Sequence, residues 1–340
     1  MRAILGTASL LLVWAVWGGS AHAAPRLEQW AEAVTAAERW KLEGQPDRAE
    51  EMLRGVLAEA GEDAVPAAVR GRVYHDLGSL CQDRFARGEA LAAYRKAMAA
   101  WEQAGVRYRL HLASTLHNMG SLFWEEGRLS EAVRLLERSA ELQVAGGDGR
   151  NGEIGRILYS LGAAELVVGR EAEAAEAFQR LLGLPEEQRR EGNRLLSAAA
   201  SAVILGMLAG KEGRAEEARL YHAQGLRLWA EWEERGRGDE KLDICVMTDL
   251  AVGLWKQDAR KEAVAVVERL VAAMETGRPA ADARWIPALK AAARILRKEH
   301  RGGEARELLR RAGEMEKANR ADLVASAHRV DLAALRREGR

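Results

Sequence analysis

The sequence predicts an all-α protein, a solenoid of about seven helical hairpins that stack along the chain. Helix-favouring Ala, Leu, Glu and Arg recur throughout, whereas only 5% of the residues are aromatic and six are Pro. A short pattern also recurs about every 42 residues, and a period of this length is typical of repeat architectures. The repeats fill nearly all of the chain after residue 23, so we expect one domain over residues 24–340.

The recurring pattern is a small residue followed, twelve positions later, by an alanine. Successive alanines, called the repeat alanines below, lie 41 to 45 residues apart. Seven occurrences in register are not expected by chance, so the pattern defines the repeat. The seven pairs are Ala37 and Ala49, Gly78 and Ala90, Gly120 and Ala132, Gly162 and Ala174, Gly206 and Ala218, Ala251 and Ala263, and Ala293 and Ala305.

The third repeat shows most clearly that each unit is a helical hairpin. Apolar Leu116, Met119 and Phe123 recur at the three- and four-residue spacing of an amphipathic helix. Gly127 then interrupts the helix, and Glu131 suits the first turn of a second one, where an acidic side chain complements the helix dipole. Small residues at the repeat positions allow the two helices to approach closely.

These features resemble the tetratricopeptide repeat family. The resemblance covers the small residue, the turn glycine, the repeat alanine and a large residue four positions after it, such as Tyr94 or Phe178. The spacing of about 42 residues is similar to the long-repeat variety found in kinesin light chains. Phe85, Asp258 and His300 depart from the pattern by replacing the turn glycine, and His222 occupies the slot of the large apolar residue.

The resemblance implies a right-handed solenoid with a concave groove lined by the first helix of each repeat. The implied repeats span residues 26–60, 67–104, 109–145, 152–183, 193–234, 241–276 and 282–318, with a capping helix over residues 319–338.

Residues 1–23 match a secretory signal peptide. Arg2 precedes an apolar stretch of about 15 residues, and Ala21 and Ala23 provide the small residues of a cleavage site. We therefore expect cleavage after Ala23 and export to the periplasm or the exterior. The alternative is an uncleaved anchor, although the apolar stretch is short for a span of roughly 20 residues.

Composition argues against several functional classes. The 51 basic and 51 acidic residues balance, so bulk charge does not favour nucleic acid. Cys81 and Cys245 form no C-x-x-C motif and are expected to be small core residues. Gly206 to Lys211 suggests a phosphate loop, but its spacing is one residue short and Glu212 stands where Ser or Thr is needed. We expect no cofactor, no metal and no catalytic residues.

The resemblance implies that residues flanking the small position face a protein or peptide partner in the groove. Asn118 matches an asparagine that can hydrogen-bond a peptide backbone through its donor and its acceptor. Trp124 and Trp255 are the strongest candidate anchors, because tryptophan is enriched among interface hot spots, whereas Trp229 and Trp232 are expected to pack in the interior. The implied groove residues are His75, Asp76, Ser79, Asp83, His117, Asn118, Ser121, Trp124, Tyr159, Ser160, Thr248, Asp249, Trp255 and Lys256.

Two other functions stay open on the sequence alone. His75 and His117 occupy equivalent positions in adjacent repeats, and with Asp76 they could form the site of an envelope enzyme, a metal receptor or a small-ligand receptor. The chain could also be an architectural protein that self-associates through its end repeats.

Overall fold

A computed structural model describes residues 24–60, 64–146, 153–186, 194–235, 244–276 and 285–318. The regular structure in these ranges is helical throughout, and the predicted fold class, an all-α repeat solenoid, is confirmed. The expected signal peptide (1–23) and capping helix (319–338) lie outside the described residues.

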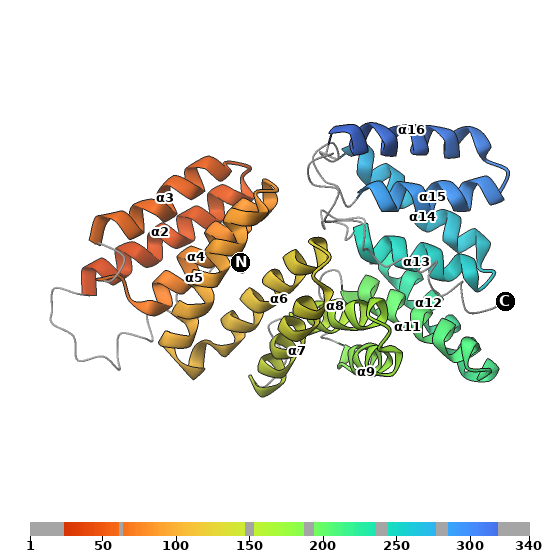
Figure 1. Ribbon diagram of the computed structural model, residues 1–340, viewed down its shortest axis with the longest axis horizontal. Coiled ribbons are helices and arrows are strands. Elements are labelled where there is room, and N and C mark those ends of the chain that lie inside the picture. Colours follow the sequence, from red (N-terminus) through yellow and green to blue (C-terminus); the bar gives the residue numbers. More distant parts are fainter. Residues whose placement is uncertain are drawn as a thin grey trace. The chain divides into compact units, whose positions relative to one another are not determined.

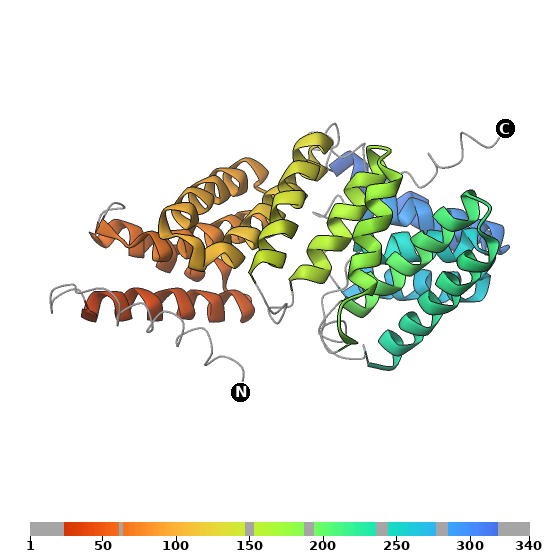
Figure 2. The same ribbon diagram turned by 90° about the horizontal axis from the view of Figure 1, so that it is seen from below.

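The helices of the described ranges follow one another as hairpins, and both views show the two helices of a hairpin lying against each other (Figures 1 and 2). A short 3₁₀ helix, η3 (Val106–Tyr108), precedes α6. The hairpins are α2 (Ala24–Leu42) with α3 (Pro46–Ala60), α4 (Ala67–Asp83) with α5 (Arg87–Ala104), α6 (Arg109–Glu125) with α7 (Leu129–Ala145), α8 (Ile154–Val167) with α9 (Glu171–Leu182), α11 (Arg194–Lys211) with α12 (Ala215–Arg235), α13 (Ile244–Lys256) with α14 (Arg260–Thr276), and α15 (Trp285–Lys298) with α16 (Gly302–Ala318).

The chain divides into two compact units, Met1–Met119 and Gly120–Arg340, and the division falls within α6. The core of the second unit is a continuous cluster of buried side chains contributed by α7 through α16. Trp229 and Trp232 are buried in this cluster and stack with ring centroids 5.1 Å apart, as the sequence predicts for packing residues.

Each hairpin turn contains one residue in the left-handed backbone region. At Gly127 φ is 73°, its N–H donates to the Trp124 carbonyl at 3.0 Å, and the Arg128 N–H donates to the Phe123 carbonyl at 2.8 Å. This pair of bonds is the Schellman motif that ends many helices. The same turn position has positive φ in all seven hairpins, at Gly44, Phe85, Gly127, Gly169, Gly213, Asp258 and His300.

In the second, third and fourth hairpins, close contact between a small residue of the first helix and a large residue of the second holds the two helices together. A Cβ added at Gly162 would lie 2.8 Å from the Phe178 ring, and one at Gly78 would lie 2.7 Å from the Tyr94 ring. At Gly120 the nearest atom would be a Leu136 side-chain carbon at 2.9 Å. Glycine is therefore needed at these positions because no other residue leaves room for the opposing side chain.

Glu165 is an exception in the core, a carboxylic acid that is only 3% exposed. Its Oε2 has no hydrogen-bond partner, and the nearest Arg170 nitrogen lies 4.0 Å from Oε1. Burial raises the pKa of Glu165 to about 7, and the acidic Glu137, Glu173 and Glu176 add to the rise while Arg170 opposes it. Compared with the unfolded chain, the folded protein therefore favours the protonated form of the Glu165 side chain.

We expect Gly162→Ala to lower the free energy of unfolding by about 1–3 kcal/mol, because the new methyl group overlaps the Phe178 ring. Gly313→Ala in α16 is the matched control: its added Cβ meets nothing within 4 Å, so the higher helix propensity of alanine should stabilise the fold by up to about 1 kcal/mol. Urea unfolding of both variants measures the difference. Equal stability of the two variants would contradict the proposed close contact.

We expect Glu165→Gln to stabilise the protein at pH 8 and to have little effect at pH 5. A carboxyl pKa that folding raises from 4.5 to about 7 means that stability is lost as pH rises through this interval. At about 1.4 kcal/mol per pKa unit, the gain at pH 8 should reach about 1–3 kcal/mol. Denaturant unfolding at both pH values measures it, with the exposed Glu141→Gln as control. A gain that is the same at both pH values would rule out titration of Glu165.

Candidate functional site

In the first unit, the predicted site residue His75 is held by a residue of the next repeat. Its Nδ1 lies 2.9 Å from Thr115 Oγ1, and its ring lies 5.6 Å from that of Tyr94. The Thr115 hydroxyl donates its single hydrogen to the His111 carbonyl at 3.0 Å. The hydroxyl can therefore accept from His75 in the tautomer that carries its hydrogen on Nδ1.

Asn118, the predicted peptide-binding amide, joins the same cluster through Tyr94. Its Nδ2 donates to the Tyr94 hydroxyl at 3.2 Å, and that hydroxyl donates to Gln82 Oε1 at 2.9 Å. Asn118 Oδ1 lies 3.4 Å from Nδ1 of His117, which is only 3% exposed. The hydrogen bonds fix the orientation of a half-buried amide, while His117 itself has almost no accessible surface.

Asp76 takes part in an ion-pair network between α4 and α2. Its Oδ2 accepts from Arg72 Nε at 2.7 Å, and Arg72 Nη2 lies 3.1 Å from Glu38 Oε2. Burial raises the pKa of the Asp76 carboxyl, and Arg72 opposes this rise. The two carboxylates in turn raise the pKa of Arg72, Asp76 more than Glu38. Asp76 therefore pairs with Arg72 on its own helix, and Arg72 joins the first and second hairpins through Glu38.

Ser79 and Asp83 share a partner on the same neighbouring helix. Lys41 Nζ donates to Ser79 Oγ and lies 2.9 Å from Asp83 Oδ2. Asp83 is exposed and Ser79 is half-buried. An exposed ion pair of this kind contributes little stability, so its members can exchange partners when a ligand arrives.

In the second unit, the predicted residues Tyr159 and Asp249 bind each other in the interior. The Tyr159 hydroxyl donates to Asp249 Oδ2 at 2.7 Å, and the two residues are 5% and 8% exposed. The bond joins α8 to α13 across 90 positions of sequence. Tyr159, Asp249 and His117 therefore do not present open surface to a groove, which corrects the sequence expectation: each finds a buried polar contact instead.

The remaining predicted residues of this unit differ in exposure. Trp124 and Trp255 are half-buried and pack against the core, and Arg260 lies 5.5 Å from the Trp255 ring centre. The Thr248 hydroxyl donates to the Ile244 carbonyl of its own helix at 2.6 Å. Ser121 and Ser160 are half-buried, and Lys256 is exposed.

The alternative site built on His75, Asp76 and His117 does not assemble. Each side chain contacts a different partner, namely Thr115, Arg72 and Asn118. No group of three His, Cys, Asp or Glu side chains within the described ranges is arranged to hold a metal ion. Among the same residues, none of the helices combines the length and the apolar character needed to cross a bilayer.

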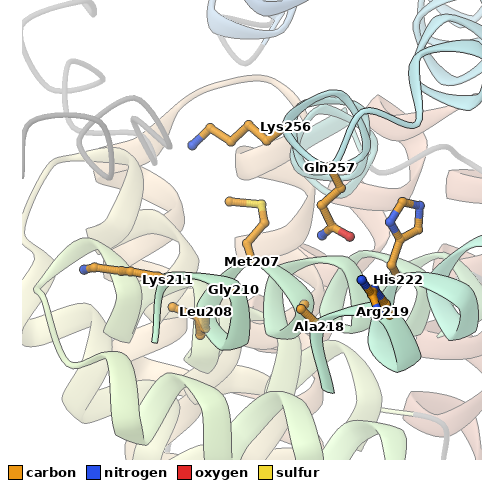
Figure 3. Close-up of a pocket in the computed structure, with 10 residues that line it drawn as sticks. Met207, Leu208, Gly210, Lys211, Ala218, Arg219, His222, Lys256 and Gln257 are labelled. Atoms are coloured by element: carbon orange, nitrogen blue, oxygen red, sulfur yellow. The ribbon is translucent and has the colours of Figure 1, made fainter. Parts of the chain in front are cut away.

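A pocket of about 450 Å³ lies in the second unit, lined by the C-terminal ends of α11 and α13 and the N-terminal half of α12 (Figure 3). Four of its lining residues are basic, and Met207 of α11 and Gln257 of the turn after α13 project into it. Lys256 is the only predicted groove residue in the lining. The basic residues are Lys211, Arg219, His222 and Lys256.

The pocket forms where the fifth repeat departs from the pattern. His222 replaces the large apolar residue, and the space next to Gly206 is filled instead by Gln257, whose side chain would lie 3.2 Å from an added Cβ. Gln257 Nε2 donates to the Val203 carbonyl at 2.6 Å. Ala218 is half-buried, whereas the other six repeat alanines are buried. The sequence signal for this pocket is a polar residue in the large apolar slot.

Comparison with known families gives one match. Residues 69–145 and 111–187, two overlapping stretches, match the family model described as tetratricopeptide repeat. Together they cover the second, third and fourth hairpins and the residues of the Tyr94 cluster. No curated protein matches the sequence.

Solved structures share the fold at low identity. The apo form of RapI is 9% identical, with a TM-score of 0.62 over 86% of this chain and 99% of that chain. Aspartyl phosphate phosphatase F from Bacillus subtilis is 12% identical, with a TM-score of 0.56 over 86% and 72%. The apo quorum sensor NprR from B. thuringiensis is 13% identical, with a TM-score of 0.51 over 85% and 88%.

These likenesses concern the fold alone, because identity is low in every case. The matched stretches contain the glycine contacts and the turns of the second, third and fourth hairpins. The chain is an all-α repeat solenoid, and the family that its residues 69–187 match is the tetratricopeptide repeat.

Proposed function

We propose that the chain is an exported scaffold that binds a protein or peptide partner through the first helices of its repeats, with no catalysis of its own. The observation that carries this proposal is the tetratricopeptide match over residues 69–187, which includes α4 and α6 and their polar side chains. Repeats of this kind bury each hairpin only against its neighbours, so long rows of first-helix residues remain available to a ligand.

The hydrogen-bonded cluster around Tyr94 supports this proposal. His75 and Asn118 are half-buried, and their partners fix their orientations before any ligand arrives. A preorganised polar group loses little conformational entropy on binding, which favours affinity. Because the whole chain has balanced charge, the specificity of such a surface depends on shape and on local polar contacts.

We expect cross-linking capture with the tagged protein, in its native envelope, to retain a defined partner that the double variant Asp83→Ala, Asn118→Ala loses. Partner recovery should fall by at least about tenfold if these groups contribute to the binding site. Trp124→Phe and Trp255→Phe test the aromatic residues and preserve most of their core packing. Identification of the retained proteins by mass spectrometry provides the measurement.

Arg134→Ala and Lys261→Ala are the controls, because both side chains are exposed on second helices, α7 and α14. Thermal unfolding of each variant separates loss of binding from loss of the Asn118 bond to Tyr94, which should cost about 0.5–1.5 kcal/mol. Equal recovery by the double variant and the controls would exclude the first-helix surface of the first unit.

Export is the second part of the proposal and rests on the sequence of residues 1–23. We expect the protein recovered from outside the cytoplasm to begin at Ala24, because Ala21 and Ala23 satisfy the cleavage pattern. Intact-mass measurement with N-terminal sequencing checks this expectation. Recovery of the full-length chain from the cytoplasm alone would contradict it.

A further inference from the structure

We propose that the pocket between α11, α12 and α13 binds an acidic peptide segment of the partner, with a partner carboxylate between the basic side chains of its rim. This inference rests on the proposed partner-binding function and assigns one contact of that function to a place. It concerns the fifth and sixth hairpins, beyond the stretch that matches the family model.

Charge is the first argument. Lys211, Arg219, His222 and Lys256 line the pocket, and none of its lining residues is acidic. The chain as a whole has equal numbers of basic and acidic residues, so the excess is local. In the view of Figure 3, the side-chain nitrogens of Lys211 and Lys256 lie on the same side of the pocket.

The basic groups can exchange their present partners for a ligand. Lys211 pairs with Glu171 at 2.8 Å and Arg219 with Glu216 at 3.2 Å, and in both pairs the side chains are substantially exposed. Exposed ion pairs are typically worth about 0–1 kcal/mol, so a bound carboxylate can compete for these cations.

The shape and lining of the pocket favour a peptide segment over an isolated anion. A volume of about 450 Å³ is within the range of ligand sites and accommodates more than a carboxylate group. Met207 offers an adaptable apolar surface, and Gln257 Oε1 can accept a hydrogen bond from a peptide N–H. We therefore expect the acidic residue to be accompanied by an apolar neighbour.

The pocket of about 450 Å³ lies at the fifth repeat, where the packing differs from that of the preceding repeat. In the preceding repeat, Phe178 packs on Gly162. In the fifth repeat, His222 stands in place of that large residue, and Gln257 lies beside Gly206 instead. Ala218 is half-buried, whereas the other six repeat alanines are buried.

The test uses the full mature chain and a fluorescein-labelled peptide of about ten residues that alternates Glu with Leu, measured by anisotropy at about 150 mM salt. A Gln–Leu peptide of the same length and free succinate are the comparison ligands. The pocket variant is Lys211→Gln, Arg219→Gln, Lys256→Gln. The charge-matched control is Arg227→Gln, Lys261→Gln, Arg306→Gln, which are exposed positions outside the pocket.

A second variant, Gly210→Phe, fills the pocket without changing its charge. An added Cβ at Gly210 meets only the Ala218 Cβ, at 3.9 Å, so the fold should tolerate the ring. We expect the pocket variant and Gly210→Phe each to weaken binding of the Glu–Leu peptide by about tenfold or more, and the control to remain within about threefold of the unmodified protein. Circular dichroism confirms that each variant is folded.

Three results of the peptide assay would overturn the proposal: no binding of the Glu–Leu peptide, equal binding by the pocket and control variants, or displacement by succinate as effective as by unlabelled peptide. The last result would identify a small-anion site instead. Failure of the proposed scaffold function would give a different result: envelope capture would then retain no partner, whether or not the Glu–Leu peptide binds. A partner retained equally by the unmodified protein and by Gly210→Phe would leave the scaffold proposal standing and remove only the pocket.

Discussion

Close approach between the two helices of a hairpin is the constraint on which this structure depends. Gly78, Gly120 and Gly162 each face a large side chain of the second helix, at distances that leave no room for even a methyl group. The large residue then fills the space that the missing side chain provides, and the repeat alanine next to it is buried. Because every hairpin must bury its faces against the next, an error at one of these contacts affects the packing of adjacent repeats.

A second constraint is the positive φ required at one position of each turn, and in three repeats a residue other than glycine adopts it with backbone strain. Phe85, Asp258 and His300 have φ between 61° and 63°, where a side chain is disfavoured, while Gly44, Gly127, Gly169 and Gly213 occupy the same conformation without penalty. The hydrogen bonds that close the turn are the same in both groups, as for Ala86 N–H to the Cys81 carbonyl at 2.9 Å. The turn geometry is therefore imposed by the packing of the hairpin and not by the choice of glycine.

The fold class could be predicted from the sequence because its pattern repeats: a small residue and an alanine twelve positions apart recur seven times, as expected for a stack of helical hairpins. The site could be predicted only in part. Periodicity identifies the first helices, but it does not distinguish a side chain that faces a ligand from one that finds a polar partner inside the stack. The Tyr159 hydroxyl hydrogen-bonds Asp249 across 90 positions of sequence, and no local pattern in either helix predicts that hydrogen bond. The Tyr94 cluster is similar, since His75, Thr115 and Asn118 come from two repeats.

The fifth repeat shows how a departure from a pattern can carry more functional information than the pattern. A histidine in the apolar slot replaces the large residue that packs on glycine in the second, third and fourth hairpins. Gln257 from the next repeat lies beside Gly206 instead and hydrogen-bonds the Val203 carbonyl. This compensation keeps α11 and α13 in contact but leaves Ala218 and Met207 partly uncovered between basic residues. A substitution that only damaged packing would be expected to leave an apolar gap. Here the gap has a polar side chain anchored in it and cations around it, which are the properties of a surface suited to bind a charged ligand.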